Sequence, residues 1–116
     1  VVLAGGGNDT VAGGGGSDTF VFAALGDSTI AASDTILDFD RAEGDKIDLQ
    51  LIDAIAGGKN NAFAWGDTIA RANGVWYSTD GTNSTVFVDR DGNPATAEMV
   101  FLLNDVALPQ STDFIL

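Results

Sequence analysis

The sequence predicts an all-β protein: the end of a parallel β-roll of short strands, capped by a small antiparallel sheet or sandwich, with room for one short helix. Residues 4–21 repeat a nine-residue pattern in which a glycine-rich turn precedes a β-forming triplet. From residue 62 onward, short β-branched and aromatic runs alternate with turn signals. The chain has 116 residues, 45% of them hydrophobic, which suffices for one compact core.

The repeat occupies residues 4–12, AGGGNDTVA, and residues 13–21, GGGGSDTFV. A flexible linker would have no reason to alternate glycine turns with β-forming triplets. Six residues make a tight turn and three make a short strand, so two units complete one coil of ~18 residues, and successive coils stack ~4.8 Å apart. The residues at position eight, Val2, Val11 and Phe20, are predicted to point into the core.

The same pattern is typical of a cation site. Glycine tolerates the positive φ that turns carbonyl oxygens inward, and Ca²⁺ takes six to eight oxygen ligands. Carbonyls at positions two and four and the position-six carboxylate supply about half of such a shell, so the remainder must come from the next coil. One coil beyond Asp9 lies Asp27, and one coil beyond Asp18 falls close to Asp34. We expect two calcium sites: Gly5, Gly7, Asp9 and Asp27 in the first, and Gly14, Gly16, Asp18 and Asp34 in the second. For Asp27 and Asp34, an ordinary turn or strand-edge aspartate is the alternative.

The middle of the chain continues the β pattern. Residues 34–49 hold two short β-like runs around a polar turn at 41–44, and residues 49–56 favour a short helix that Gly57 and Gly58 would end. In the acidic cluster of this segment, Asp45 is a candidate for a further metal ligand, with turn solvation as the alternative. The glycine pair divides the chain into residues 1–58, the calcium-binding roll end and following strands, and residues 59–116, an antiparallel β cap with the terminal segment.

The second half reads as strands and turns. Residues 74–78 and 85–89 are strand-like and flank a hairpin turn at 79–82, and residues 98–103 form a further β run.

The segment that begins at Asp89 hints at an EF-hand calcium loop. However, Pro94 stands where that loop needs glycine, and Val100 stands where it needs glutamate. We therefore expect a plain turn here.

Composition excludes several functions. There are 17 acidic residues against 5 basic ones, a net charge of −12, which argues against nucleic-acid and anionic-membrane partners. The absence of cysteine and histidine excludes disulfides, Cys/His zinc sites and histidine-based catalytic triads. No apolar run approaches the ~20 residues that span a bilayer, so no membrane insertion is expected.

The tandem repeat resembles the calcium-binding nonapeptide of RTX proteins, GGxGxDxUx, with Ala4 as the one departure. Residues 13–49, with GGGGSDTFVF, DTILDF and DKIDL, resemble the C-terminal domain of serralysin-type secreted metalloproteases. In that family, late calcium ligands fall at the positions of Asp27 and Asp34. Its protease activity needs an HExxH helix, which a chain without histidine lacks. The resemblance implies a non-catalytic module whose cargo or catalytic domain would lie upstream of Val1.

The closing residues Asp113, Phe114, Ile115 and Leu116 resemble the C-terminal signal that type I secretion systems read in this family, with a terminal apolar strand as the alternative. The resemblance implies a secreted, extracellular bacterial protein, monomeric, that folds on calcium binding after export. An alternative function is an extracellular polysaccharide-binding module of a secreted RTX enzyme, using Trp65, Trp76 and Tyr77, although such aromatic residues more often serve packing. A glycosidase built on paired aspartates is the remaining alternative.

Overall fold

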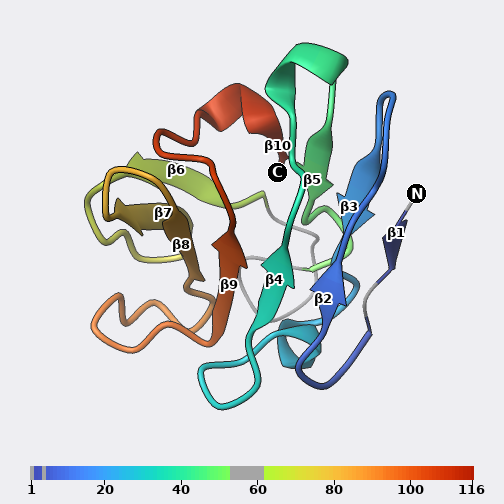
Figure 1. Ribbon diagram of the computed structural model, residues 1–116. Coiled ribbons are helices and arrows are strands. Elements are labelled where there is room, and N and C mark those ends of the chain that lie inside the picture. Colours follow the sequence, from blue (N-terminus) through green and yellow to red (C-terminus); the bar gives the residue numbers. More distant parts are fainter. Residues whose placement is uncertain (1, 4, 53–61) are drawn as a thin grey trace.

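The computed structural model describes residues 2–3, 5–52 and 62–116. In these residues the chain forms ten short strands arranged in two sheets (Figure 1). The first sheet contains, in spatial order, β1 (Val2–Leu3), β3 (Thr19–Val21), β5 (Lys46–Asp48) and β10 (Phe114–Ile115). The second contains β2 (Thr10–Val11), β4 (Asp34–Ile36), β9 (Met99–Leu103), β8 (Ser84–Val88), β7 (Gly74–Thr79) and β6 (Ala64–Asp67). The prediction of a mainly β protein is confirmed.

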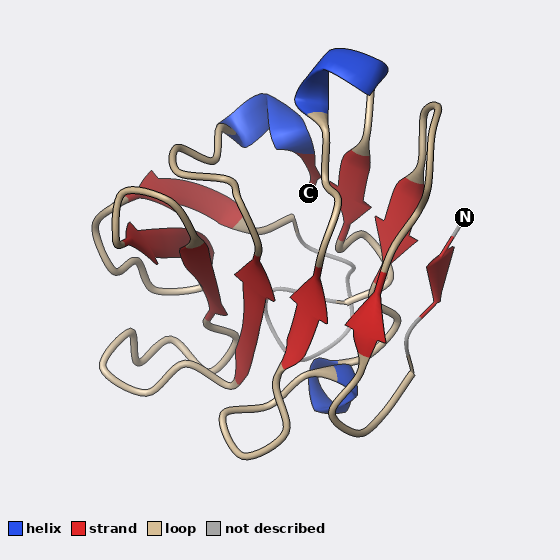
Figure 2. Ribbon diagram, in the orientation of Figure 1, coloured by secondary structure: helices blue, strands red, loops and turns tan. Residues whose placement is uncertain are grey.

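Helical structure in the described residues is limited to three single 3₁₀ turns: η1 (Leu25–Asp27), η2 (Arg41–Glu43) and η3 (Ser111–Asp113) (Figure 2). None of them has the length or apolar character to cross a bilayer. Residues 49–52 form a turn closed by a hydrogen bond from Ile52 N–H to the Leu49 carbonyl, 3.0 Å, and not the start of a helix. The rest of the expected helix at 49–56 and the boundary at Gly57 and Gly58 lie outside the described residues.

The first five strands alternate between the two sheets, so that each glycine turn carries the chain from one sheet to the other (Figure 1). Every pairing among these strands is parallel. Val2 lies opposite Phe20, which is the separation expected of one repeat coil. The next coil is longer, because Thr10 lies opposite Thr35 and Thr19 lies opposite Lys46.

The later strands extend these sheets instead of forming a sheet of their own. β7, β8 and β9 make an antiparallel meander, as the sequence predicts, but β9 also pairs in parallel with β4. The terminal strand β10 pairs in parallel with β5. Strands from both halves of the chain therefore hold each sheet together.

The hydrophobic core lies between the two sheets. Phe20 and Ile47 of the first sheet and Ile36 and Phe101 of the second are at most 2% exposed. The ring of Phe101 stacks on that of Phe22 with centroids 4.7 Å apart. Phe20 is buried as predicted from its place in the repeat, while the equivalent residues Val2 and Val11 are partly buried and pack against the same core. Burying such side chains stabilises the fold by about 1.5–3 kcal/mol each.

Candidate metal centres

The two glycine turns have the backbone that the repeat pattern predicts. Gly5 and Gly14 at position two have φ of 74° and 85°, and Gly7 and Gly16 at position four have φ of 109° and 92°. Side-chain-bearing residues rarely adopt these angles, so glycine is needed at each of the four positions. The two repeats thus form the same turn twice, and each turn is followed by its aspartate, Asp9 or Asp18.

At the first turn, Asp9 lies beside Asp34. The Asp9 N–H donates to Oδ1 of Asp34 at 2.9 Å, an arrangement that follows from the parallel pairing of β2 with β4. Asp34 is fully buried, and its own N–H donates to the Ser28 hydroxyl at 2.8 Å. That hydroxyl in turn donates to the Val100 carbonyl, so the loop before β4 is fixed to β9.

A third carboxylate, Asp27, belongs to the same group. Burial, together with the negative charges of Asp9 and Asp27, raises the pKa of Asp34, although the hydrogen bond from the Asp9 backbone opposes the rise. Asp27 itself is held by the backbone N–H groups of Ala23 and Ala24, which donate to its Oδ2 at 2.9 and 3.1 Å. The carboxylates of Asp9 and Asp27 therefore both act on Asp34 at the first turn.

At the second turn, the neighbour of Asp18 is Asp45. The Asp18 N–H donates to Asp45 Oδ1 at 2.8 Å, and the Asp40 N–H donates to Asp45 Oδ2 at 2.9 Å. Asp45 is 1% exposed, although it lies between a polar turn and a strand. The expected pairing of Asp18 with Asp34 is therefore wrong: Asp34 lies with Asp9, and Asp45 occupies the corresponding place beside Asp18.

The physical reason is the length of the second coil. The segment between β3 and β4 contains η1 and its flanking loops, which a repeat of constant length does not include. Counting one repeat coil forward from Asp18 therefore stops short of the strand that actually pairs with β3. Asp27 comes close to Asp34 because η1 places it there.

Two further acidic residues hold the second glycine turn, and the repeat pattern gave no indication of them. Asp38 accepts from the N–H groups of Gly13 and Gly14 at 2.8 and 2.7 Å, and Glu43 accepts from Gly16 N–H at 2.5 Å. The sequence does place Asp38 and Glu43 between β4 and β5. These strands pair with β2 and β3, which flank the second glycine turn, and this position is the signal that could have identified both residues. Their carboxylates secure a turn whose backbone donors would otherwise face solvent.

Three buried carboxylate oxygens in these groups accept no hydrogen bond from the described residues: Oδ2 of Asp9, of Asp18 and of Asp34. A buried carboxylate oxygen without a donor or a cation is costly, and the cost rises when a second carboxylate lies beside it. Hard oxygen donors of this kind suit Ca²⁺. The residues at both turns therefore fit a calcium ion, which would supply the missing positive charge.

The three aromatic residues considered for sugar binding pack against other rings or lie in the core. Tyr77 and Trp76 are 4% and 7% exposed, Trp76 stacks on Phe87 at 5.7 Å, and the partly buried Trp65 packs against Phe114 at 5.1 Å. These rings serve packing rather than an open binding face.

The terminal segment is also structural in the folded chain. Asp113 is fully buried and Phe114 is 7% exposed, while Ile115 and Leu116 are partly buried. Asp113 accepts from Arg41 Nε at 2.7 Å and from Arg41 Nη2 at 2.6 Å, which is a bidentate ion pair. These contacts agree with the alternative of a terminal apolar strand.

Comparison with known proteins adds the context for these sites. No curated protein sequence is significantly similar to the chain. Among solved structures, the AlgE6R3 subunit of the mannuronan C5-epimerase from Azotobacter vinelandii, determined in solution, is similar with a TM-score of 0.60 and 27% sequence identity. The similarity covers 97% of this chain and 60% of the epimerase subunit, so the chain spans less than two thirds of that relative. Residues 1–116 match the family described as peptidase M10 serralysin C terminal. The chain therefore belongs to the serralysin C-terminal family.

Proposed function

We propose that this chain is a non-catalytic calcium-binding module that folds on calcium binding after type I secretion and carries the export signal for an upstream cargo. Residues 1–58 would hold the calcium-binding end of the β-roll and the strands that follow it, and residues 59–116 would form the β cap with the terminal segment. The protein would act outside the bacterial cell, as a monomer joined to the cargo or catalytic domain of its own polypeptide.

The observation that carries the proposal is the set of unpaired oxygens at the two glycine turns. Asp9, Asp18 and Asp34 each have a buried carboxylate oxygen that accepts no hydrogen bond from the described residues. Repulsion between Asp9 and Asp34 opposes folding until a cation lies between them. Calcium binds the folded arrangement and not the extended chain, so calcium binding is coupled to folding.

The size of this coupling is sufficient for a folding switch. A site at a free calcium concentration 100 times its Kd contributes ~2.7 kcal/mol to stability. Two such sites contribute about 5 kcal/mol, which equals the whole stability of a marginal small domain. The module would therefore be loose in a calcium-poor cytoplasm and compact outside the cell.

The test is thermal unfolding of the chain with millimolar calcium and with chelator. We expect calcium to raise the Tm of the wild type and to raise it much less in an Asp9→Asn/Asp18→Asn double variant. Asp80→Asn is the matched control: Asp80 is an exposed acid in the turn between β7 and β8, and asparagine keeps an oxygen that can accept from the N–H groups of Thr82 and Asn83. Equal Tm values with and without calcium in the wild type would refute the folding switch.

The export signal is proposed for residues 113–116, and it needs a separate test because these residues also stabilise the fold. Deleting them should block export of a fused cargo, but the deletion also removes the ion pair between Arg41 and Asp113. Arg41→Ala is the matched control, since it breaks the same ion pair and leaves the terminal residues intact. Export that survives in Arg41→Ala and is lost in the deletion supports the signal. Export that persists after the deletion places the signal elsewhere.

Polysaccharide binding is the second candidate, and the similarity to a mannuronan epimerase subunit is its support. The aromatic residues that would stack on sugar rings are largely buried, as described for Trp76 and Tyr77. Titration of the folded protein with mannuronan, before and after Trp76→Ala, separates this candidate from the calcium module.

A further inference from the structure

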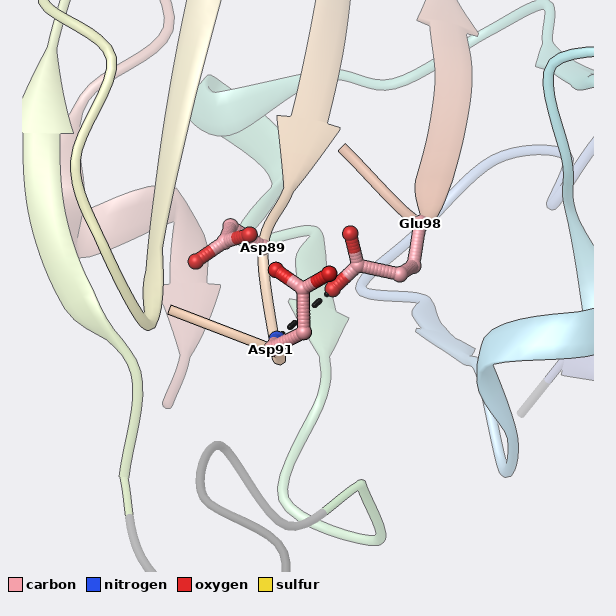
Figure 3. Close-up of side chains that lie close together, drawn as sticks. All are labelled: Asp89, Asp91 and Glu98. Atoms are coloured by element: carbon pink, nitrogen blue, oxygen red, sulfur yellow. Dashed lines mark hydrogen bonds between the residues drawn. The ribbon is translucent and has the colours of Figure 1, made fainter. Parts of the chain in front are cut away.

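Outside the glycine turns, three carboxylates meet at the loop end of the β8–β9 hairpin. Asp89 directly follows β8 and Glu98 directly precedes β9, and Glu98 N–H donates to the Val88 carbonyl at 3.0 Å. Because β8 and β9 are antiparallel, the first and last residues of the loop between them lie next to each other. Asp91 lies in the loop between them, and Figure 3 shows the three side chains side by side.

Backbone donors hold Asp89 and Glu98 through one oxygen of each carboxylate. Oδ2 of Asp89 accepts from Asn73 N–H at 2.7 Å and from Gly92 N–H at 3.1 Å. Oε1 of Glu98 accepts from the N–H groups of Arg90 and Asp91 at 2.7 and 2.8 Å.

One oxygen in this group points to a missing ligand. Asp89 is 0% exposed, and its Oδ1 is buried and accepts no hydrogen bond from the described residues. Burial, the adjacent Asp91 carboxylate and the charge of Glu98 raise the pKa of Asp89, although the hydrogen bond from Asn73 opposes the rise. A cation beside the unpaired Oδ1 would favour the anionic form of Asp89, which burial and the neighbouring carboxylates disfavour.

The spacing suits a single ion. One ligand oxygen from each of the three side chains lies within 4.8 Å of the others. Two oxygens bound to the same calcium at ~2.3–2.6 Å from it cannot be more than about 5.2 Å apart, so all three oxygens fulfil this condition. Three carboxylates with no nitrogen or sulfur ligand favour a hard divalent cation.

We propose that Asp89, Asp91 and Glu98 form an additional calcium site, independent of the glycine turns. Counted from Asp89, Glu98 is the tenth residue of the loop and lies just before β9, whereas an EF-hand places its glutamate at the twelfth position, so the site is not an EF-hand. The ion would join the end of β8 to the start of β9 and neutralise the buried charge of Asp89.

The test is a calcium titration of the whole chain by calorimetry, comparing the wild type with Glu98→Gln. Glutamine keeps an oxygen that can accept from the Arg90 and Asp91 backbone, but it lacks the charge. We expect Glu98→Gln to bind one calcium fewer, or to bind it at least about tenfold more weakly. The control Asp80→Asn, which removes an exposed acid in the turn between β7 and β8, should keep the wild-type stoichiometry.

Thermal unfolding distinguishes metal binding from a purely structural role of Glu98. Without calcium, Glu98→Gln should unfold at the wild-type temperature or higher, because it removes repulsion, whereas with calcium it should gain less stability than the wild type. An unchanged calcium stoichiometry and affinity, or an equal loss of Tm with and without calcium, would overturn the proposal.

A further variant tests this site separately from the proposed function. In Asp9→Asn/Asp18→Asn, binding at the glycine turns should be reduced while the calcium that Glu98 controls is still bound. Loss of that calcium in the double variant would refute the independence of the two regions.

Discussion

Replacing Arg41 by alanine should destabilise the folded chain, because it leaves a buried carboxylate without its main partner. The Asp113 side chain is 1% exposed, and two nitrogens of Arg41 donate to its two oxygens at 2.6 and 2.7 Å. After the substitution, the only donor to Asp113 that remains among those described is Gln110 N–H at 2.8 Å.

The magnitude follows from the burial of the two partners. Breaking a fully buried pair costs about 3–5 kcal/mol, mostly as the penalty of an uncompensated charge. Arg41 is 42% exposed, so water already screens part of the interaction, and a cost of about 2–3 kcal/mol is expected for Arg41→Ala. With an unfolding entropy of about 2.1 cal/mol/K per residue, this lowers the Tm by roughly 8–12 °C.

The assay is thermal and urea unfolding at a fixed, saturating calcium concentration, with Arg41→Lys and Asp113→Ala as companions. Lysine keeps the charge but cannot form the bidentate contact, so the Tm of Arg41→Lys should lie between those of the wild type and Arg41→Ala. The double variant Arg41→Ala/Asp113→Ala should lose less stability than the sum of the losses in the two single variants, since either single change already removes the ion pair. A Tm of Arg41→Ala within about 2 °C of the wild type would refute this reasoning.

Three other changes test the turns and the core. Gly13→Ala should weaken calcium binding at the second turn, because its Cβ would lie 2.6 Å from Asp18 Oδ2; Gly15→Ala, whose Cβ meets nothing closer than 4.0 Å, should leave the calcium titration unchanged. In chelator, the free energy of unfolding should fall as pH rises above 3.8, because the raised pKa of Asp34 keeps the folded state protonated to higher pH than the unfolded state. Urea unfolding at several pH values measures this slope, and Asp34→Asn should flatten it. An unchanged slope in Asp34→Asn would contradict the assignment to Asp34. Phe101→Ala, at a fully buried position stacked on Phe22, should cost about 3–5 kcal/mol in urea unfolding, and a loss below 1 kcal/mol would show that the core does not depend on this ring.

The sequence predicts the periodic part of this molecule well. Position in the repeat is enough to place Gly5, Gly7, Gly14 and Gly16 at positive φ and to bury Phe20, because both properties follow from local geometry. The runs that become β7, β8 and β9 are recognisable for the same reason: each strand has its own pattern and its own flanking turn.

What the sequence could not give is the register between distant strands. The loop that contains η1 has no repeat, so nothing local shows how far it displaces the next coil, and Asp45 rather than Asp34 becomes the neighbour of Asp18. The cluster of Asp89, Asp91 and Glu98 was missed for a related reason. A calcium-loop motif is defined by ligands at fixed spacings along the chain, whereas the antiparallel pairing of β8 and β9 places Glu98 beside Asp89.

The pairings of β4 with β9 and of β5 with β10 also bear on when the chain can fold. Asp34 lies opposite Phe101 and Ile47 lies opposite Phe114, so each sheet joins residues separated by more than half the length of the chain. Contacts of such long sequence separation form slowly, because the loop must close before the contact is gained. A chain still emerging from the ribosome lacks these partners until β9 and β10 have been synthesised. Topology therefore delays folding during synthesis even where calcium is present, and an unfolded chain is available to any machinery that handles it before the sheets close.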